Sequence, residues 1–241
     1  MPTRHSDPFT SRAATLNAAV NPYVALLREG AGSGTLPVRF GAELATCTGR
    51  WRAHIAEANG LTAVAATMPL VVEIGCHKGA TLLAMATAHP NILFLGLDIT
   101  FKRVVMTAQR AQSLGLRNVY CAMANANGMD KLFAAGELSG CVIFFPDPWN
   151  KKARQTKHQL ISGEFCQKLA RTVAPGGFCW LKTDQESYFA KATNNLQSVG
   201  FTPSAERLPP LLERDYSSSF ERLFQGQGLP TFGANWLLAE G

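Results

Sequence analysis

The sequence lacks long apolar segments. It contains no run of about 18 apolar residues, the length expected of a transmembrane helix, and the N-terminal stretch MPTRHSDPFTSRAATLN has no apolar core of signal-peptide length. These absences argue against a membrane-spanning protein and against export. We therefore expect a cytoplasmic protein without a membrane segment.

Closely spaced cysteine pairs are also missing. The chain has 6 cysteines but no Cys-x-x-Cys pair, and several of the cysteines lie inside apolar segments. Zinc sites and redox motifs commonly need such pairs, whereas isolated cysteines in apolar segments pack as small hydrophobic residues. We expect no metal site and no disulfides, as is usual in a reducing compartment.

Charged residues are few, at 17% of the chain, and they are unbalanced. The 23 Lys and Arg against 17 Asp and Glu give a formal net charge of +6. Such an excess indicates affinity for polyanions, although it is far below that of a histone. The 241 residues, 46% of them hydrophobic, are enough for one sizeable core.

Two regions of the chain differ in pattern. Residues 1–69 are weakly patterned, and we expect a partly flexible N-terminal extension with short helices in which REGAGSGTLP, from Arg28 to Pro37, is a linker. From residue 70 onward, continuous apolar segments alternate with helical patterns. Strands that are apolar on both faces are typical of a parallel sheet covered by helices on both sides. We therefore predict an α/β catalytic domain over residues 70–241.

The ends of the predicted strands carry the candidate functional residues, because open α/β sheets bind ligands at the carboxyl ends of their strands. The strand LVVEIG is followed by CHKG, a glycine-rich turn that lets backbone N–H groups approach a phosphate or carboxylate, although such turns often only connect a strand to a helix. The next strand ends at Asp98, which can accept ribose hydroxyls or cap the following helix. The third ends near Asn125, an adenine contact or a simple turn residue.

The segment FFPDPWNKK follows the fourth predicted strand. Its two prolines cannot continue the strand, so they hold Asp147 on a stiff loop, and Trp149 offers a stacking face for a planar substrate. The basic residues that begin at Lys151 meet no acid until Glu164, which suits either a solvated surface or phosphate contacts. The place of this loop at a strand end favours a ligand-binding role for Asp147 over a purely structural one.

Taken together, VEIGCHKG, GLD, FFPDPWNKK, APGGFCWLKTD and SSSFERL resemble the tRNA (guanine-N7-)-methyltransferase family in their order and spacing. The resemblance covers the chain from about residue 70 to its C-terminus. It implies a Rossmann-like class I methyltransferase fold, a seven-stranded, mostly parallel sheet with a reversed last strand and helices on both faces. It also implies S-adenosyl-L-methionine as cofactor, released as S-adenosyl-L-homocysteine, and tRNA as partner.

The resemblance also implies roles for individual residues, with Asp147 as the catalytic aspartate. The cofactor-binding residues would be Glu73, Gly75, Cys76, His77, Gly79, Asp98, Asn125 and Ala126. The substrate-binding residues would be Lys151, Asp184, Ser218, Phe220 and Glu221, to which we add Trp149. The chain departs from the family pattern at His77, where a glycine is common, and at Asn125, where an acid is usual.

Three functions remain open from the sequence. The first is methyl transfer to guanine N7 in the variable loop of tRNA, a reaction that needs orientation rather than a general base because N7 carries a lone pair and no proton. The second is methylation of a small, planar, purine-like heterocycle, which a basic tract diluted by Ala153 and Gln155 leaves possible. The third is a non-catalytic RNA-binding homologue that no longer binds the cofactor. Either a monomer or a homodimer is compatible with the sequence.

Overall fold

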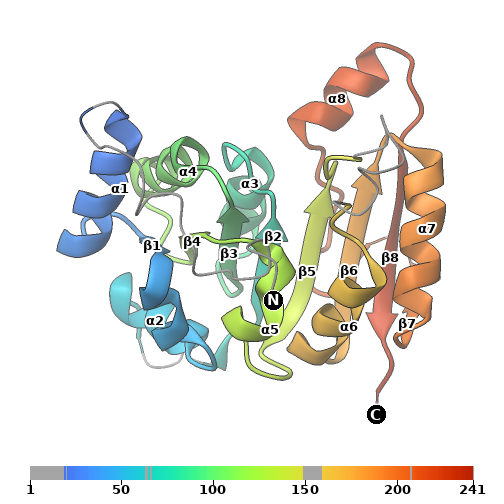
Figure 1. The fold of residues 1–241 in the computed structure, drawn as a ribbon, viewed down its shortest axis with the longest axis horizontal. Coiled ribbons are helices and arrows are strands. Elements are labelled where there is room, and N and C mark those ends of the chain that lie inside the picture. Colours follow the sequence, from blue (N-terminus) through green and yellow to red (C-terminus); the bar gives the residue numbers. More distant parts are fainter. Residues whose placement is uncertain are drawn as a thin grey trace, which may run out of the picture.

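The computed structural model describes residues 19, 21–62, 65, 67–148, 159–206 and 208–240. The chain forms one eight-stranded sheet in the order β1-β4-β3-β2-β5-β6-β8-β7 (Figure 1). The strands are β1 (Val38–Phe40), β2 (Leu70–Ile74), β3 (Leu93–Asp98), β4 (Val119–Met123), β5 (Leu138–Phe144), β6 (Val173–Thr183), β7 (Phe201–Pro203) and β8 (Phe232–Leu238). The helices are α1 (Pro22–Ser33), α2 (Trp51–Ala58), α3 (Ala80–Ala88), α4 (Phe101–Ser113), α5 (Met129–Leu132), α6 (Gly163–Thr172), α7 (Glu186–Gln197) and α8 (Ser219–Gly226), with short 3-10 turns η2 (Gly41–Cys47) and η4 (Ala126–Gly128).

The sheet confirms the predicted class I methyltransferase fold. Strands β2 to β6 pair in parallel, and β8 runs antiparallel to both β6 and β7. These seven strands correspond to the seven that were predicted. Strand β1, from the N-terminal extension, pairs in parallel with β4 and adds an eighth strand at the edge.

Two hydrophobic cores lie on opposite faces of the sheet, because alternate residues of each strand point to opposite sides. In β2, Leu70 and Val72 belong to the core shared with α2, α5, α6 and α7, whereas Val71 belongs to the core shared with α1, α3 and α4. All three side chains are fully buried. Burial on both faces explains why these strands read as continuous apolar runs.

The prediction of a linker from Arg28 to Pro37 is wrong over most of that segment. Helix α1 continues to Ser33, and it begins after Asn21, whose side chain accepts a hydrogen bond from the Tyr23 amide at 3.1 Å. Gly30 is buried inside this helix, and a Cβ there would lie 2.6 Å from Leu36 Cδ1. The glycine therefore permits close packing of the helix, whereas composition alone had suggested a flexible segment.

Glu137 ties the region before β2 to the rest of the fold. Its buried carboxylate accepts backbone hydrogen bonds from Gly49 at 2.8 Å, Trp51 at 2.9 Å and Ala134 at 2.9 Å. The Trp51 indole is itself fully buried and donates to the Leu132 carbonyl at 2.8 Å. The start of α2 is thus fixed against α5. The predicted boundary between an N-terminal extension, residues 1–69, and a catalytic domain, residues 70–241, stays a prediction.

The structure also bears on three features that the sequence argued against, namely a membrane-spanning helix, disulfides and a metal site. Within the described ranges, no helix is both long and apolar enough to cross a bilayer. The six cysteines are free and buried. Among the same described residues, no group of three or more His, Cys, Asp or Glu side chains is placed to hold a metal ion.

Candidate functional site

The carboxyl ends of β2, β3, β5 and β6 meet at one edge of the sheet, where the chain order of the strands reverses between β2 and β5. Helix α8 lies beyond the ends of β5 and β6 at this edge (Figure 1). Open α/β sheets bind their ligands at such a point. The structure brings most of the predicted site residues to this edge.

The turn after β2 is built for close backbone approach. Gly75 and Gly79 both have left-handed backbone conformations, with φ of 76° and 72°. The amides of Gly75 and Cys76 both donate to the Leu97 carbonyl, at 2.8 and 3.1 Å, which fixes the turn against the end of β3. A Cβ on Gly79 would lie 2.5 Å from the Thr107 side chain, whereas the space beside Gly75 is open. Gly79 is therefore needed for packing, and Gly75 leaves room for a ligand.

His77 keeps the backbone conformation that a glycine would have. Its φ is 51°, its amide donates to Asp98 Oδ2 at 3.2 Å, and its carbonyl accepts from Thr107 at 3.2 Å. The imidazole points to α8, where it meets the Phe220 ring edge-on at a centroid distance of 5.6 Å. Burial and then the nearby Arg103 charge lower the pKa of His77, so the ring is neutral at physiological pH.

Asp98 serves the local structure as well as facing the site edge. The residue is 4% exposed, and its carboxylate accepts hydrogen bonds from the amides of Thr100 at 2.9 Å and His77 at 3.2 Å. Arg103 approaches the same carboxylate at 3.5 Å. Asp98 thus supports the start of α4, and its contact with a ribose stays a prediction.

Glu73 is the most strongly perturbed acid of the site. It is 4% exposed, and its Oε2 atom is buried without a hydrogen-bond partner among the described residues. Desolvation, assisted by the charge of Asp98, raises the pKa of Glu73 to about 8 against the opposing hydrogen bond with the Leu82 backbone. A buried carboxyl with an orphaned oxygen beside an open glycine turn fits a cationic ligand group. This arrangement matches the ammonium of an amino-acid moiety such as that of S-adenosylmethionine.

The predicted adenine contacts lie at the end of β4. Asn125 starts the 3-10 turn η4, and its Oδ1 accepts from the Asn127 amide at 3.0 Å. Ala126 is buried beside it. The structure therefore supports the turn interpretation of Asn125, and contact with adenine stays a prediction.

The loop after β5 carries the predicted catalytic aspartate. Phe145 opens it in a left-handed conformation, with φ of 51°, and its amide donates to the Lys182 carbonyl at 2.7 Å. Asp147 is exposed, and the Pro148 carbonyl accepts from Gln159 at 2.8 Å. The loop is thus held at both ends with its carboxylate accessible.

Two predicted substrate residues, Trp149 and Lys151, lie outside the described residues. Asp184 follows β6 and is half-buried, where it accepts a hydrogen bond from the Gln185 side chain at 2.6 Å. Its role as a substrate contact stays a prediction.

Helix α8 brings the last predicted segment to the same edge. Ser218 caps the helix by accepting from the Glu221 amide at 3.0 Å, and Phe220 is 40% exposed beside His77. Glu221 is only 4% exposed, and both of its oxygens accept from Lys182 Nζ, at 3.1 and 3.0 Å. The sequence analysis did not predict this ion pair.

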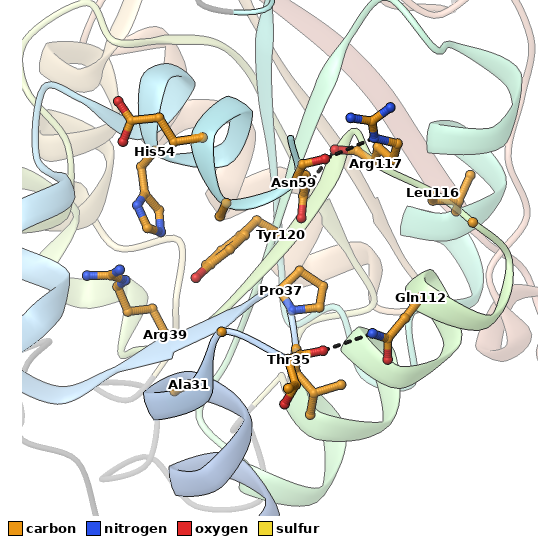
Figure 2. A pocket seen from close by; sticks show the side chains of 15 residues that line it. Ala31, Thr35, Pro37, Arg39, His54, Asn59, Gln112, Leu116, Arg117 and Tyr120 are labelled. Carbon is orange, nitrogen blue, oxygen red and sulfur yellow. Dashed lines mark hydrogen bonds between the residues drawn. The ribbon is translucent and has the colours of Figure 1, made fainter. Parts of the chain in front are cut away.

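A cleft of about 620 Å³ lies elsewhere (Figure 2). It is bordered by α1, β1, α2 and the connection from α4 to β4, and no predicted site residue lines it. Figure 2 shows Tyr120, at the beginning of β4, with its hydroxyl directed to Arg39 and His54. Burial, and then the charge of Arg39, lowers the pKa of His54 to about 4. This cleft is therefore remote from the strand ends that carry the candidate site.

Comparisons with known proteins point to one family. Residues 67–233 match the model of a methyltransferase family described as "Putative methyltransferase". The chain is 29% identical over 185 residues to a tRNA (guanine-N(7)-)-methyltransferase of Bdellovibrio bacteriovorus, covering 75% of this chain and 85% of the relative. It is 34% identical over 163 residues to the protein of the same name from Geobacillus kaustophilus, covering 68% of this chain and 70% of the relative.

Solved structures agree on the fold. The 16S rRNA methyltransferase KamB matches with a TM-score of 0.53 at 15% identity, covering 71% of this chain and 88% of KamB. The cyclase SpnF matches with a TM-score of 0.52 at 13% identity, covering 80% of this chain and 82% of SpnF. Since proteins of such different activity share the fold, these structural matches establish architecture alone. The family match and the named relatives go further: this chain belongs to the tRNA (guanine-N7-)-methyltransferase family of class I, S-adenosylmethionine-dependent methyltransferases.

Proposed function

We propose that this protein transfers a methyl group from S-adenosylmethionine to N7 of a guanine in tRNA, in the variable loop. The observation that carries the proposal is the convergence of three segments at one sheet edge. These are the Glu73 turn, the Asp147 loop and the start of α8 with Glu221. The names of the relatives support the same substrate.

S-adenosylmethionine, when bound, supplies an electrophilic methyl group on a sulfonium. Glu73 and the turn from Gly75 to Gly79 would hold its amino-acid part, because the buried Glu73 carboxylate lacks a partner for one oxygen and the backbone beside Gly75 is open. Asp98, Asn125 and Ala126 would hold the adenosine part. Cys76 and His77 would contribute backbone groups of the same turn.

The substrate guanine would be held by acceptors. Asp147 is exposed on a loop fixed by the Lys182 carbonyl and Gln159, so its carboxylate can accept from guanine N1–H and N2–H. This contact orients N7 and stabilises the positive charge that the base gains on methylation. Neither Asp147 nor Glu221 needs to remove a proton, since N7 has none.

The surface of α4 beside the site suits a polyanion. Lys102 and Arg103 are exposed, with Lys102 over the Tyr23 ring at 5.5 Å and Arg103 beside Asp98. Arg110, also exposed, donates to the Lys78 carbonyl at 2.7 Å. These cations predict binding of tRNA that weakens with salt.

The test is transfer of labelled methyl groups to unmodified tRNA, with the product nucleoside identified by mass spectrometry. Wild-type protein should form 7-methylguanosine, and Asp147→Asn should lower kcat by about 100-fold, the usual cost of removing one group that stabilises developing charge. Glu57→Gln, which changes an exposed carboxylate far from the strand ends, serves as the matched control.

The other hypotheses are distinct outcomes of the same assay. Label in small purine-like heterocycles but not in tRNA would favour the small-molecule enzyme. Absence of both transfer and calorimetric cofactor binding would favour the non-catalytic RNA-binding homologue. Either outcome would overturn the proposal.

A further inference from the structure

Lys182 is a buried cation at the centre of the candidate site. It is the penultimate residue of β6, it is 5% exposed, and it pairs with Phe144 of β5 on one side and Gly233 of β8 on the other. A lysine buried this deeply loses its hydration, so its charge needs partners inside the protein.

The ammonium of Lys182 finds those partners in the segment that leads into α8. Its Nζ atom lies 2.6 Å from Asp215 Oδ1, 3.0 Å from the Tyr216 carbonyl, and 3.1 and 3.0 Å from the two oxygens of Glu221. It also lies over the rings of Phe144 and Trp180, at 5.1 and 5.2 Å from their centroids. One ammonium therefore fixes the residues on both sides of the cap at Ser218.

The backbone of the same residue holds the opposite wall of the site. The Lys182 carbonyl accepts from the amide of Phe145, the left-handed residue that opens the Asp147 loop. Lys182 is thus bonded through its backbone to the segment that presents Asp147, and through its side chain to the segment that presents Glu221. The relative placement of these two carboxylates depends on one residue.

We infer that Lys182 is a positioning residue for base recognition: its ammonium sets the carboxylate of Glu221 and the first turn of α8 relative to Asp147. The inference rests on the proposed function, because Asp147 is its proposed guanine contact and Glu221 is predicted to bind the same substrate. Without the ammonium, the carboxylates of Asp215 and Glu221 would face each other across the vacated position, and repulsion would displace Glu221.

Close packing restricts the conformation of the Lys182 side chain. A Cβ on Gly233 would lie 3.1 Å from Lys182 Cγ, so the glycine in the neighbouring strand avoids a tight contact with the lysine stem. Lys182→Met preserves the length of the stem and removes the charge. Lys182→Arg keeps the charge but presents it as a planar fork that cannot reproduce the same bonds.

The experiment measures steady-state methylation of tRNA and calorimetric cofactor binding for both variants. Lys182→Met should lower kcat/KM for tRNA at least tenfold while the cofactor Kd changes less than twofold, and Lys182→Arg should recover part of the loss. Lys131→Met, which changes an exposed lysine of α5, is the matched control and should behave as wild type. Wild-type kinetics of Lys182→Met would overturn the inference.

A double variant keeps the inference testable if Lys182→Met alone fails to fold. Replacing an ion pair by two neutral groups is often tolerated where removing one partner is not. Lys182→Met with Glu221→Gln should match Glu221→Gln alone, because the lysine acts through Glu221. If the double variant is at least tenfold worse than Glu221→Gln, Lys182 acts by another route and the inference is wrong.

Hydrogen exchange separates this inference from the proposed function. In folded Lys182→Met, the amides of the first turn of α8 should exchange at least tenfold faster than in the wild type, and in the double variant they should exchange as they do in Glu221→Gln. Unchanged exchange in Lys182→Met refutes the positional role, whatever the substrate. If the wild type does not methylate tRNA but exchange changes as expected, the proposed function and the link to guanine recognition fail, while the role of Lys182 in placing α8 stands.

Discussion

Glu73 should make the stability of this protein fall as pH rises, and Glu73→Gln should remove that dependence. The pKa of the buried carboxyl is raised to about 8, whereas an exposed glutamate in an unfolded chain titrates near 4.5. When the pKa of an acid is raised in the folded state, that state holds the proton more tightly than the unfolded chain. The resulting contribution to folding stability is fully present below pH of about 4.5 and is lost as the pH rises to about 8. Between pH 5 and pH 8 the wild type should lose about 3 kcal/mol relative to the glutamine variant.

The assay is chemical or thermal unfolding of both proteins at several values of pH between about 5 and 9. Comparing the change with pH, rather than the stability at one pH, cancels any constant cost of placing an amide near the orphaned Oε2 position. The stability difference should favour Glu73→Gln increasingly up to pH of about 8 and then level off. Parallel curves for the two proteins would refute the reasoning.

Cofactor binding should show the opposite sign. A cationic group beside Glu73 binds best to the ionised carboxylate, so affinity for S-adenosylmethionine should increase with pH up to about 8. Glu73→Gln should bind more weakly and lose this increase. Ionisation of Glu73 therefore lowers the stability of the fold while it raises the affinity for the cofactor, a compromise that is common at functional sites.

Two further predictions concern the supporting structure. Glu137→Gln should destabilise the protein by about 3 kcal/mol and lower Tm by about 6 to 12 °C, because the buried amide of Trp51 loses a charged acceptor; a change in thermal unfolding no larger than that of Glu57→Gln would contradict this account. His77→Gly relieves a left-handed side-chain conformation as it loses the contact with Phe220, so its stability should stay close to that of the wild type. His77→Ala keeps the strain without the ring contact and should unfold with about 1 kcal/mol less free energy than His77→Gly in denaturant titrations; equal stability would show that φ of His77 is not strained.

The parallel core was predictable because its strands are apolar on both faces and alternate with segments of helical pattern. The helical patterns expected between the strands are present as helices such as α3 and α6. The segment PYVALLREGAGS was not predictable as a helix from composition, since its glycines and serines suggest a linker until the packing of Gly30 against Leu36 is seen. Strand β1 has only three residues, with Arg39 at its centre, which is too short and polar to stand out.

The candidate site was predictable where a motif fixes local geometry and hidden where partners are distant in sequence. The turn at Gly75, the acid at Asp98 and the loop at Asp147 all lie at the end of a strand or shortly after it. The pairing of Lys182 with Asp215 and Glu221 joins residues more than thirty positions apart, so it depends on the folded chain. The available signal was physical: a lysine at the end of the apolar segment GFCWLK requires an acid somewhere in the fold.

The pairing of β1 with β4 has a consequence for shortened forms of this protein. The Cys121 amide donates to the Pro37 carbonyl at 2.8 Å, and β1 occupies the hydrogen-bonding edge of β4. A fragment beginning at residue 70 would leave that edge uncovered, with a row of unpaired amides and carbonyls beside apolar side chains. Open edges of this kind recruit strands from other molecules. Such a fragment, even with every proposed site residue present, should therefore self-associate into aggregates unless another strand takes the place of β1.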